Sequence, residues 1–177
     1  MDPSIAIRDA TEADGAACAA IYEPYVRDTA ITFETVAPTA DEFARRIADS
    51  LRVHAWVVAE QEGRVVGYAY GGQVKARAAY DWSCEVSVYL EMGGPRRSGL
   101  GRALYQGLFD RLTERGYTTA IAGMTLPNPA SEGLHRAMGF EPVGTYRNIG
   151  FKHGAWRDVA WSQRDLAPRT GEPAPVR

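Results

Sequence analysis

Cysteine is scarce in this sequence of 177 residues, which contains only Cys18 and Cys84. The two lie far apart and form no CxxC motif, so neither a zinc site nor a redox pair is indicated, and we expect no metal. The sequence does not exclude a disulfide between them, but two free thiols in a reducing compartment are the simpler interpretation.

Long apolar runs are also missing. No stretch approaches the roughly 18 apolar residues that a membrane span requires. Residues 1–8 lack the basic region and following apolar run that mark a signal peptide. We therefore expect a cytoplasmic protein with no membrane partner.

An excess of charge of one sign is lacking too, because 20 basic and 22 acidic side chains give a formal net charge of −2. A nucleic-acid-binding domain is typically strongly basic, so no nucleic-acid partner is expected. The length suits one domain, which we place at residues 1–166. The proline-rich residues 167–177 are predicted to be a flexible tail.

Hydrophobic periodicity and capping signals predict a mixed order of strands and helices. Thr11 with Asp14, and Thr39 with Glu42, form capping boxes that open two helices, and Pro24 is a candidate break in the first. This order favours an α/β or α+β fold around one sheet. The extended segments are 5–8, 31–34, 55–61, 64–74, 82–90, 119–126, 142–149 and 156–164, and the further helices are 101–115 and 131–138.

The segment 82–90 separates its side chains onto two faces. A half-solvated antiparallel strand would explain this alternation, but a helix follows closely and suggests a covered position, where an acidic side chain needs a reason. Cys84 faces away from Glu85, so a covalent acyl-cysteine is not expected. One face carries Ser83, Glu85, Ser87 and Tyr89, and the other carries Trp82, Cys84, Val86, Val88 and Leu90.

A glycine-rich loop follows this strand and runs into the helix 101–115. Glycines let successive N–H groups converge on an anion, and a helix N-terminus adds unpaired donors and its positive dipole end. An ordinary tight turn explains the glycines about as well. If the loop binds a diphosphate, the residues concerned are Arg96, Arg97, Ser98, Gly99, Leu100, Gly101 and Arg102.

Further motifs follow in order: Asn128 before a short helix, Leu134-His135 within it, and Gly139-Phe140 after it. With the Arg-x-x-Gly-x-Gly loop, this set resembles the acetyl-CoA-binding core of the GCN5-related N-acetyltransferases. The segments Phe33-Glu34, 75–82, Glu85-x-x-Val88-Tyr89 and 150–159 are similar to the phosphinothricin acetyltransferase group, which includes enzymes acting on methionine sulfoximine and sulfone.

This resemblance covers about residues 5–166. It implies a mixed, mostly antiparallel central sheet flanked by helices, with acetyl-CoA as co-substrate and a homodimer. It also implies that Glu85 is the base that takes a proton from the amine. His135 would protonate the departing thiolate or help deprotonate the amine, although a lone histidine is as often structural.

The resemblance assigns further residues to the two substrates. The strand residues Val88, Tyr89 and Leu90 would hold the pantetheine arm, with the amides of Val88 and Leu90 polarising the thioester carbonyl. Asn128 would bind the cofactor, unless it is simply a turn residue. The loop before Arg96 is one residue longer than is usual in the group, which leaves the register of its phosphate contacts open. The acceptor is assigned to Phe33, Lys75, Arg77 and Tyr80.

Lys75 and Arg77 would hold the carboxylate or the oxyacid group of an amino-acid substrate if the preceding strand continues through them, and a solvated basic loop is the alternative. The function implied is transfer of the acetyl group from acetyl-CoA to the α-amino group of a small amino-acid-like acceptor, by direct attack in a ternary complex. Acetylation of protein N-termini or polyamines is a second hypothesis. A non-catalytic acyl-CoA-binding regulator is a third, against which Glu85 and His135 argue.

Overall fold

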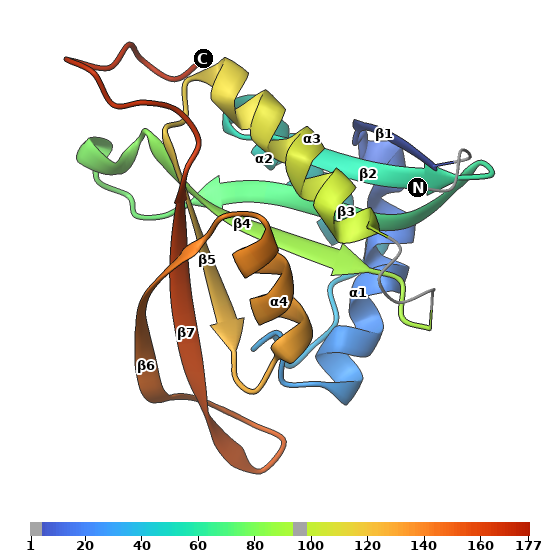
Figure 1. Ribbon diagram of the computed structural model, residues 1–177. Coiled ribbons are helices and arrows are strands. Elements are labelled where there is room, and N and C mark those ends of the chain that lie inside the picture. Colours follow the sequence, from blue (N-terminus) through green and yellow to red (C-terminus); the bar gives the residue numbers. More distant parts are fainter. Residues whose placement is uncertain (1–4, 94–98) are drawn as a thin grey trace.

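The computed structural model describes residues 5–93 and 99–177. Arg96, Arg97 and Ser98, predicted to bind phosphate, lie outside the described residues. In the described part, one sheet has the strand order β1-β2-β3-β4-β5-β7-β6 (Figure 1). Its parallel pair is β4 with β5, and the other five pairs are antiparallel. The predicted mixed, mostly antiparallel α/β fold is therefore confirmed.

The elements follow the predicted order closely. The strands are β1 (Ile5–Asp9), β2 (Trp56–Gln61), β3 (Arg64–Gln73), β4 (Ser83–Leu90), β5 (Thr119–Thr125), β6 (Glu141–Lys152) and β7 (Ala155–Asp165). The helices are α1 (Gly15–Asp28), α2 (Ala40–Val53), α3 (Leu100–Arg115) and α4 (Pro129–Ala137), with short 3-10 turns η1 (Glu12–Asp14) and η2 (Ala78–Tyr80). No helix in the described ranges is long and apolar enough to cross a membrane.

Helices cover both faces of the sheet, and each face has its own core (Figure 1). On one face, Leu104, Leu108 and Leu112 of α3 are completely buried against the sheet, at the spacing that marked this stripe in the sequence. On the other face, Phe43 and Ile47 of α2 pack with α1 and with side chains of β2 and β3 that point away from α3. The central strands are therefore covered on both sides.

The two central strands β4 and β5 pair over a short distance only. Their register runs from Ser83 opposite Thr119 to Glu85 opposite Ile121. Both strands continue beyond this point, and Figure 1 shows them diverging, with α4 beside the fork. The fork leaves the facing edges of the two strands without pairing to each other, and Glu85 stands where it opens.

Pro24 and the segment 31–34 differ from expectation, and the alternative left open at Lys75 and Arg77 is decided. Pro24 does not break α1, which continues from Gly15 to Asp28 around it. The segment 31–34 forms no strand. The carbonyls of Ile31 and Thr32 accept from the side chains of Thr125 and Lys152 rather than from the N–H groups of a neighbouring strand. The strand before Lys75 stops at Gln73, so it does not continue through Lys75 and Arg77.

The C-terminal segment contacts the body of the molecule. The indole Nε1 of Trp82 donates to the carbonyl of Ala174 at 2.7 Å, and the backbone N–H of Arg177 donates to the carbonyl of Arg115 at 2.9 Å. Val176 packs against the α3 core. Flexibility of residues 167–177 stays a prediction, and these contacts show where the end of the segment docks.

Candidate active site

Glu85 occupies a half-buried position at the fork between β4 and β5. Burial raises the pKa of this carboxyl, and the nearby ammonium of Lys75 lowers it. The opposing effects suit a proton acceptor, because a carboxylate in a partly apolar site binds a proton more tightly than an exposed one. The alternation predicted for this strand is confirmed, since Cys84 and Val86 are buried in the α3 core on the other face.

The edge of β4 that faces the fork carries backbone donors. Glu91 donates its N–H to the carbonyl of Val66 on the β3 side at 3.0 Å. Because successive residues of a strand direct their N–H groups to opposite edges, Val88 and Leu90 direct theirs toward β5. The carbonyl of Leu90 accepts from the hydroxyl of Tyr25 at 2.7 Å, which fixes the end of this edge.

The start of α3 combines two glycines with different roles. Gly99 is the N-cap residue with a φ of 82°, a conformation that favours glycine. A Cβ at Gly101 would lie 3.1 Å from the Leu134 side chain of α4, so the lack of a side chain lets the two helices approach. Leu100 is half-buried and packs on the α3 core. The first turn of α3 is thus shaped by its close packing against α4.

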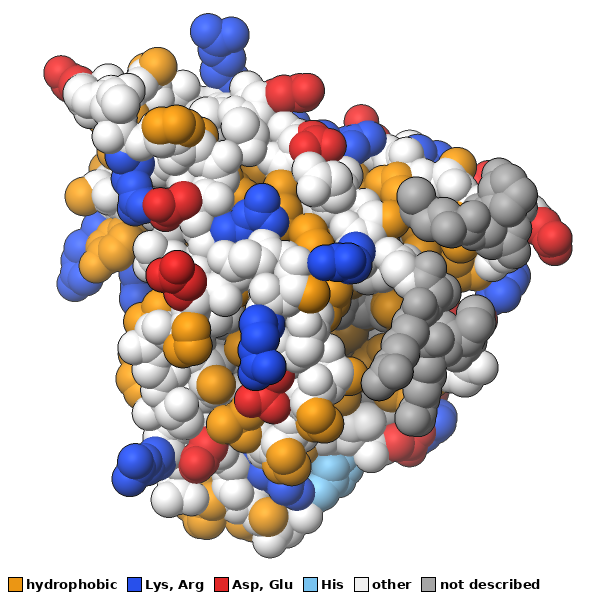
Figure 2. Space-filling model, viewed as in Figure 1, with side chains coloured by type: hydrophobic (Ala, Val, Ile, Leu, Met, Phe, Trp, Pro, Cys, Tyr) orange, Lys and Arg blue, Asp and Glu red, His pale blue; other side chains and the backbone are white. Residues whose placement is uncertain are grey.

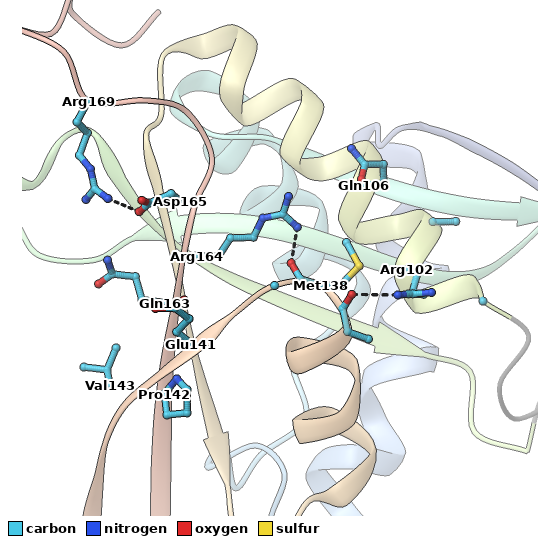
Figure 3. A pocket seen from close by; sticks show the side chains of 14 residues that line it. Arg102, Gln106, Met138, Glu141, Pro142, Val143, Gln163, Arg164, Asp165 and Arg169 are labelled. Carbon is cyan, nitrogen blue, oxygen red and sulfur yellow. Dashed lines mark hydrogen bonds and ion pairs between the residues drawn. The ribbon is translucent and has the colours of Figure 1, made fainter.

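A wide cavity of about 1050 Å³ opens between the first turn of α3, the end of α4, and β6–β7 (Figure 3). Its arginines are held by the protein: Arg102 donates to the carbonyl of Ala137 at 3.0 Å, Arg164 to the carbonyl of Met138, and Arg169 to Asp165. Figure 2 shows basic and acidic side chains interspersed over this face, and a recess with hydrophobic side chains.

His135 lies in the interior between α3 and α4 and is 4% exposed. Its Nδ1 is 2.8 Å from the carbonyl of Ser131, which only accepts, so Nδ1 carries the proton. Burial lowers the pKa of the ring and favours its neutral form. Nε2 then accepts from the hydroxyl of Tyr105 at 2.9 Å. The geometry fits a ring that orients Tyr105, and the predicted role as an acid stays a prediction.

Asn128 is the N-cap of α4. Its Oδ1 accepts from the backbone N–H of Ser131 at 3.2 Å, which satisfies one of the unpaired donors of the first turn. The side chain is half-buried. The structure therefore assigns Asn128 a local role, and its predicted bond to the cofactor stays a prediction.

The structure brings one of the four residues predicted to bind the acceptor, Lys75, into electrostatic range of Glu85. Lys75 and Arg77 are exposed between β3 and η2, and Tyr80 ends η2 and is 43% exposed. The ring of Phe33 lies against Gly150 of β6, where an added Cβ would clash at 2.2 Å. Of these residues, Lys75 is the one whose charge acts on Glu85.

Two contacts hold the segment carrying Phe33 against the turn between β6 and β7. Lys152, 6% exposed, donates from Nζ to the carbonyl of Thr32 at 2.8 Å, and burial lowers the pKa of its ammonium. The Nε2 of His153 is 3.1 Å from the carbonyl of Thr29. The sequence pattern had indicated no role for Lys152, because its only signal, a lysine in a polar turn, is typical of a solvated side chain.

Within the described residues, no group of three or more His, Cys, Asp and Glu is arranged to hold a metal ion. The two cysteines are free and buried. Burial raises the pKa of the Cys84 thiol to about 12, so it is not a thiolate nucleophile near neutral pH.

The site thus combines a fork between two parallel strands, a half-buried carboxyl at its base and a glycine-capped helix beside it. Residues 7–161 match the model of the acetyltransferase (GNAT) domain. The chain belongs to the GNAT acetyltransferase family. The resemblance inferred from the loop, Glu85 and the downstream motifs is therefore confirmed.

Individual GNAT relatives are similar over nearly the whole chain. The phosphinothricin N-acetyltransferase of Streptomyces viridochromogenes is 40% identical over 173 residues, 98% of this chain and 93% of the relative. The L-methionine sulfoximine/L-methionine sulfone acetyltransferase of Pseudomonas paraeruginosa is 36% identical, over 96% of this chain and 99% of the relative.

A solved structure is similar to the same extent. The phosphinothricin acetyltransferase of Sinorhizobium meliloti, crystallised in complex with AcCoA, is 37% identical with a TM-score of 0.90, over 97% of this chain and 94% of that one. That relative therefore carries the acetyl donor AcCoA on a backbone similar to the one described above.

Proposed function

We propose that this protein transfers the acetyl group of acetyl-CoA to the α-amino group of a small amino-acid-like acceptor. The observation that carries the proposal is the position of Glu85, half-buried at the fork, next to a strand edge whose amides at Val88 and Leu90 point into it. The relatives named for phosphinothricin and for methionine sulfoximine or sulfone support the choice of acceptor.

The residues of the fork suit acetyl-CoA. The unpaired edge of β4 can receive an amide-bearing arm as a strand would, and the N–H groups at the start of α3 suit a diphosphate. When bound, acetyl-CoA supplies an acetyl group activated as a thioester. We assign the N–H groups of Val88 and Leu90 to the pantetheine arm and the thioester carbonyl, and a donor aimed at the developing oxyanion contributes about 3 kcal/mol.

We assign Glu85 the role of the base that accepts a proton from the acceptor's amino group. An ammonium has no lone pair with which to attack, so the amine must lose a proton, directly to the carboxylate or through a water. Lys75 and Arg77 are proposed to hold the acceptor's carboxylate, and Phe33 and Tyr80 to wall its binding site. Direct attack within a ternary complex agrees with Cys84, whose thiol is buried on the face away from Glu85.

The test is release of CoA thiol from acetyl-CoA with phosphinothricin, methionine sulfoximine, methionine sulfone, spermidine and N-terminal peptides as acceptors. We expect turnover with the amino acids. Activity on peptides or spermidine alone would favour an acetyltransferase for protein N-termini or polyamines. Binding of acetyl-CoA without turnover on any acceptor would favour a non-catalytic regulator.

Glu85→Gln separates a catalytic from a structural glutamate. As the base, Glu85 is expected to contribute about 10²-fold or more to turnover. Since folding raises its pKa, the stabilisation it gives is present below its unfolded pKa and is lost as pH rises through the folded one. The variant should therefore have a higher Tm than the wild type at pH 7, with the difference shrinking in acid. Unchanged turnover contradicts the assignment.

We further propose a homodimer that works in the cytoplasm. Two free, buried thiols suit a reducing compartment. The hairpin of β6 and β7 exposes large apolar side chains of a kind that is usually covered in an assembly, namely Val143, Tyr146, Ile149, Phe151 and Trp156.

A further inference from the structure

A second cavity, of about 330 Å³, lies between α2 and the ends of β2 and β3. Trp56 and Tyr70 form one wall as stacked rings, with centroids 4.4 Å apart and planes at 16°. Phe43 adds an edge contact to Trp56. The cavity is therefore lined largely by flat apolar surfaces, which suit an uncharged side chain.

The lack of a side chain at Gly72 of β3 leaves a space between this cavity and Glu85. Tyr70 and Gly72 of β3 pair with Ser87 and Glu85 of β4, so all four belong to one face of the sheet. Gly72 has no side chain opposite Glu85. A Cβ added there would meet one atom, the carbonyl oxygen of Glu85, at 4.0 Å. The space above Gly72 therefore adjoins the carboxylate on one side and the cavity on the other.

The charge around the cavity is balanced by the protein itself. Arg46 lines it, and Glu34 accepts from its two terminal nitrogens at 2.8 and 3.2 Å. Glu42 accepts from its Nε at 3.2 Å. Asp49, also in the lining, pairs with Arg52 at 2.8 Å. Glu42 also pairs with Arg45. The charges around the cavity are therefore already paired with one another, and an anionic group entering it would lose its hydration without meeting an unpaired cation among the described lining residues.

We propose that this cavity holds the acceptor's side chain and selects an uncharged one that carries a hydrogen-bond acceptor, such as a sulfone or sulfoximine, over an anionic phosphinate. The proposal rests on the proposed acetyltransferase function and adds to it the class of side chain. A guanidinium has five N–H groups, more than the three named bonds use, so Arg46 can donate to an uncharged oxygen without giving up its carboxylates.

The first experiment compares methionine sulfone and phosphinothricin as acceptors for the wild type. We expect kcat/KM at least tenfold higher for methionine sulfone. Glu34→Gln removes one carboxylate from Arg46 and should move the ratio toward phosphinothricin by about threefold or more. A wild-type preference for phosphinothricin, or a ratio unmoved by Glu34→Gln, overturns the inference and leaves the acetyltransferase proposal standing.

The second experiment fills the space above Gly72. Gly72→Leu should lower kcat/KM at least tenfold for methionine sulfone and much less for alanine, with KM for acetyl-CoA unchanged. Thr113→Leu is the control, because Thr113 is exposed on α3, outside the cavity lining and outside the hairpin of β6 and β7. An equal loss for both acceptors, or no loss, contradicts the subsite. Absence of turnover by the wild type on any amino acid contradicts the proposed function instead.

Discussion

Two effects shift the pKa of the Glu85 carboxyl in opposite directions. Burial raises the pKa and Lys75 lowers it. A base must be ionised, so kcat/KM should rise with pH through this pKa, above the value near 4.3 of an exposed glutamate. Lys75→Met removes the opposing cation, and the acid limb of the pH profile should shift to higher pH. The measurement is kcat/KM against pH for both proteins.

The control is Arg27→Met, which removes an exposed, ion-paired cation at the end of α1 and should leave the limb in place. A limb that Lys75→Met does not move would show that another group titrates.

The positions of individual site residues were predictable only where the alternation of side chains along a strand indicates them. Alternation along 82–90 predicted that Glu85 and Cys84 lie on opposite faces of the sheet, and the structure agrees. Arg46 and Tyr105 gave no signal, because one owes its position to Glu34 and the other to His135, both distant in sequence. The gap at Gly72 had a weak signal, since glycine inside a strand often marks a close approach or an open space.

At the scale of elements, Asn128 tests whether α4 is fixed by its own cap. Asn128→Ala removes the acceptor for the N–H of Ser131 and should cost about 1 kcal/mol of the free energy of unfolding. Asn128→Asp keeps an oxygen in place and should keep the stability. Thermal unfolding and KM for acetyl-CoA are measured for both. A higher KM for the aspartate variant at unchanged Tm would reveal a direct bond to the cofactor.

Most elements follow from local sequence signals, and the fork does not. Thr39 caps α2 through the N–H of Glu42, as its capping box predicts. The lengths of β4 and β5 were also close to prediction. Their parting after Glu85 and Ile121 depends on what packs beside each strand, and side-chain patterns within either strand do not encode it. The position of the candidate site therefore depends on contacts between segments that are distant in the sequence.

At the scale of the whole molecule, the hairpin of β6 and β7 lies at the edge of the sheet, where β6 pairs with β7 (Figure 1). Tyr146 and Trp156 are 59% and 62% exposed there, and Phe151 packs on Trp156 with ring centroids 5.4 Å apart. Large apolar side chains in such number on one hairpin favour association through this surface, because their burial removes apolar area from water.

We therefore expect the wild type in solution to have twice the chain mass of 19.4 kDa. Tyr146→Glu combined with Trp156→Glu would place two carboxylates in the buried contact, where unpaired charge is costly, and should yield the monomer. Val53→Glu is the control, since Val53 is 51% exposed at the end of α2, away from the hairpin, and should leave the dimer intact. Light scattering after size-exclusion chromatography measures the mass. A wild type that stays monomeric at micromolar concentration contradicts the proposed assembly, and a double variant that stays dimeric contradicts this surface.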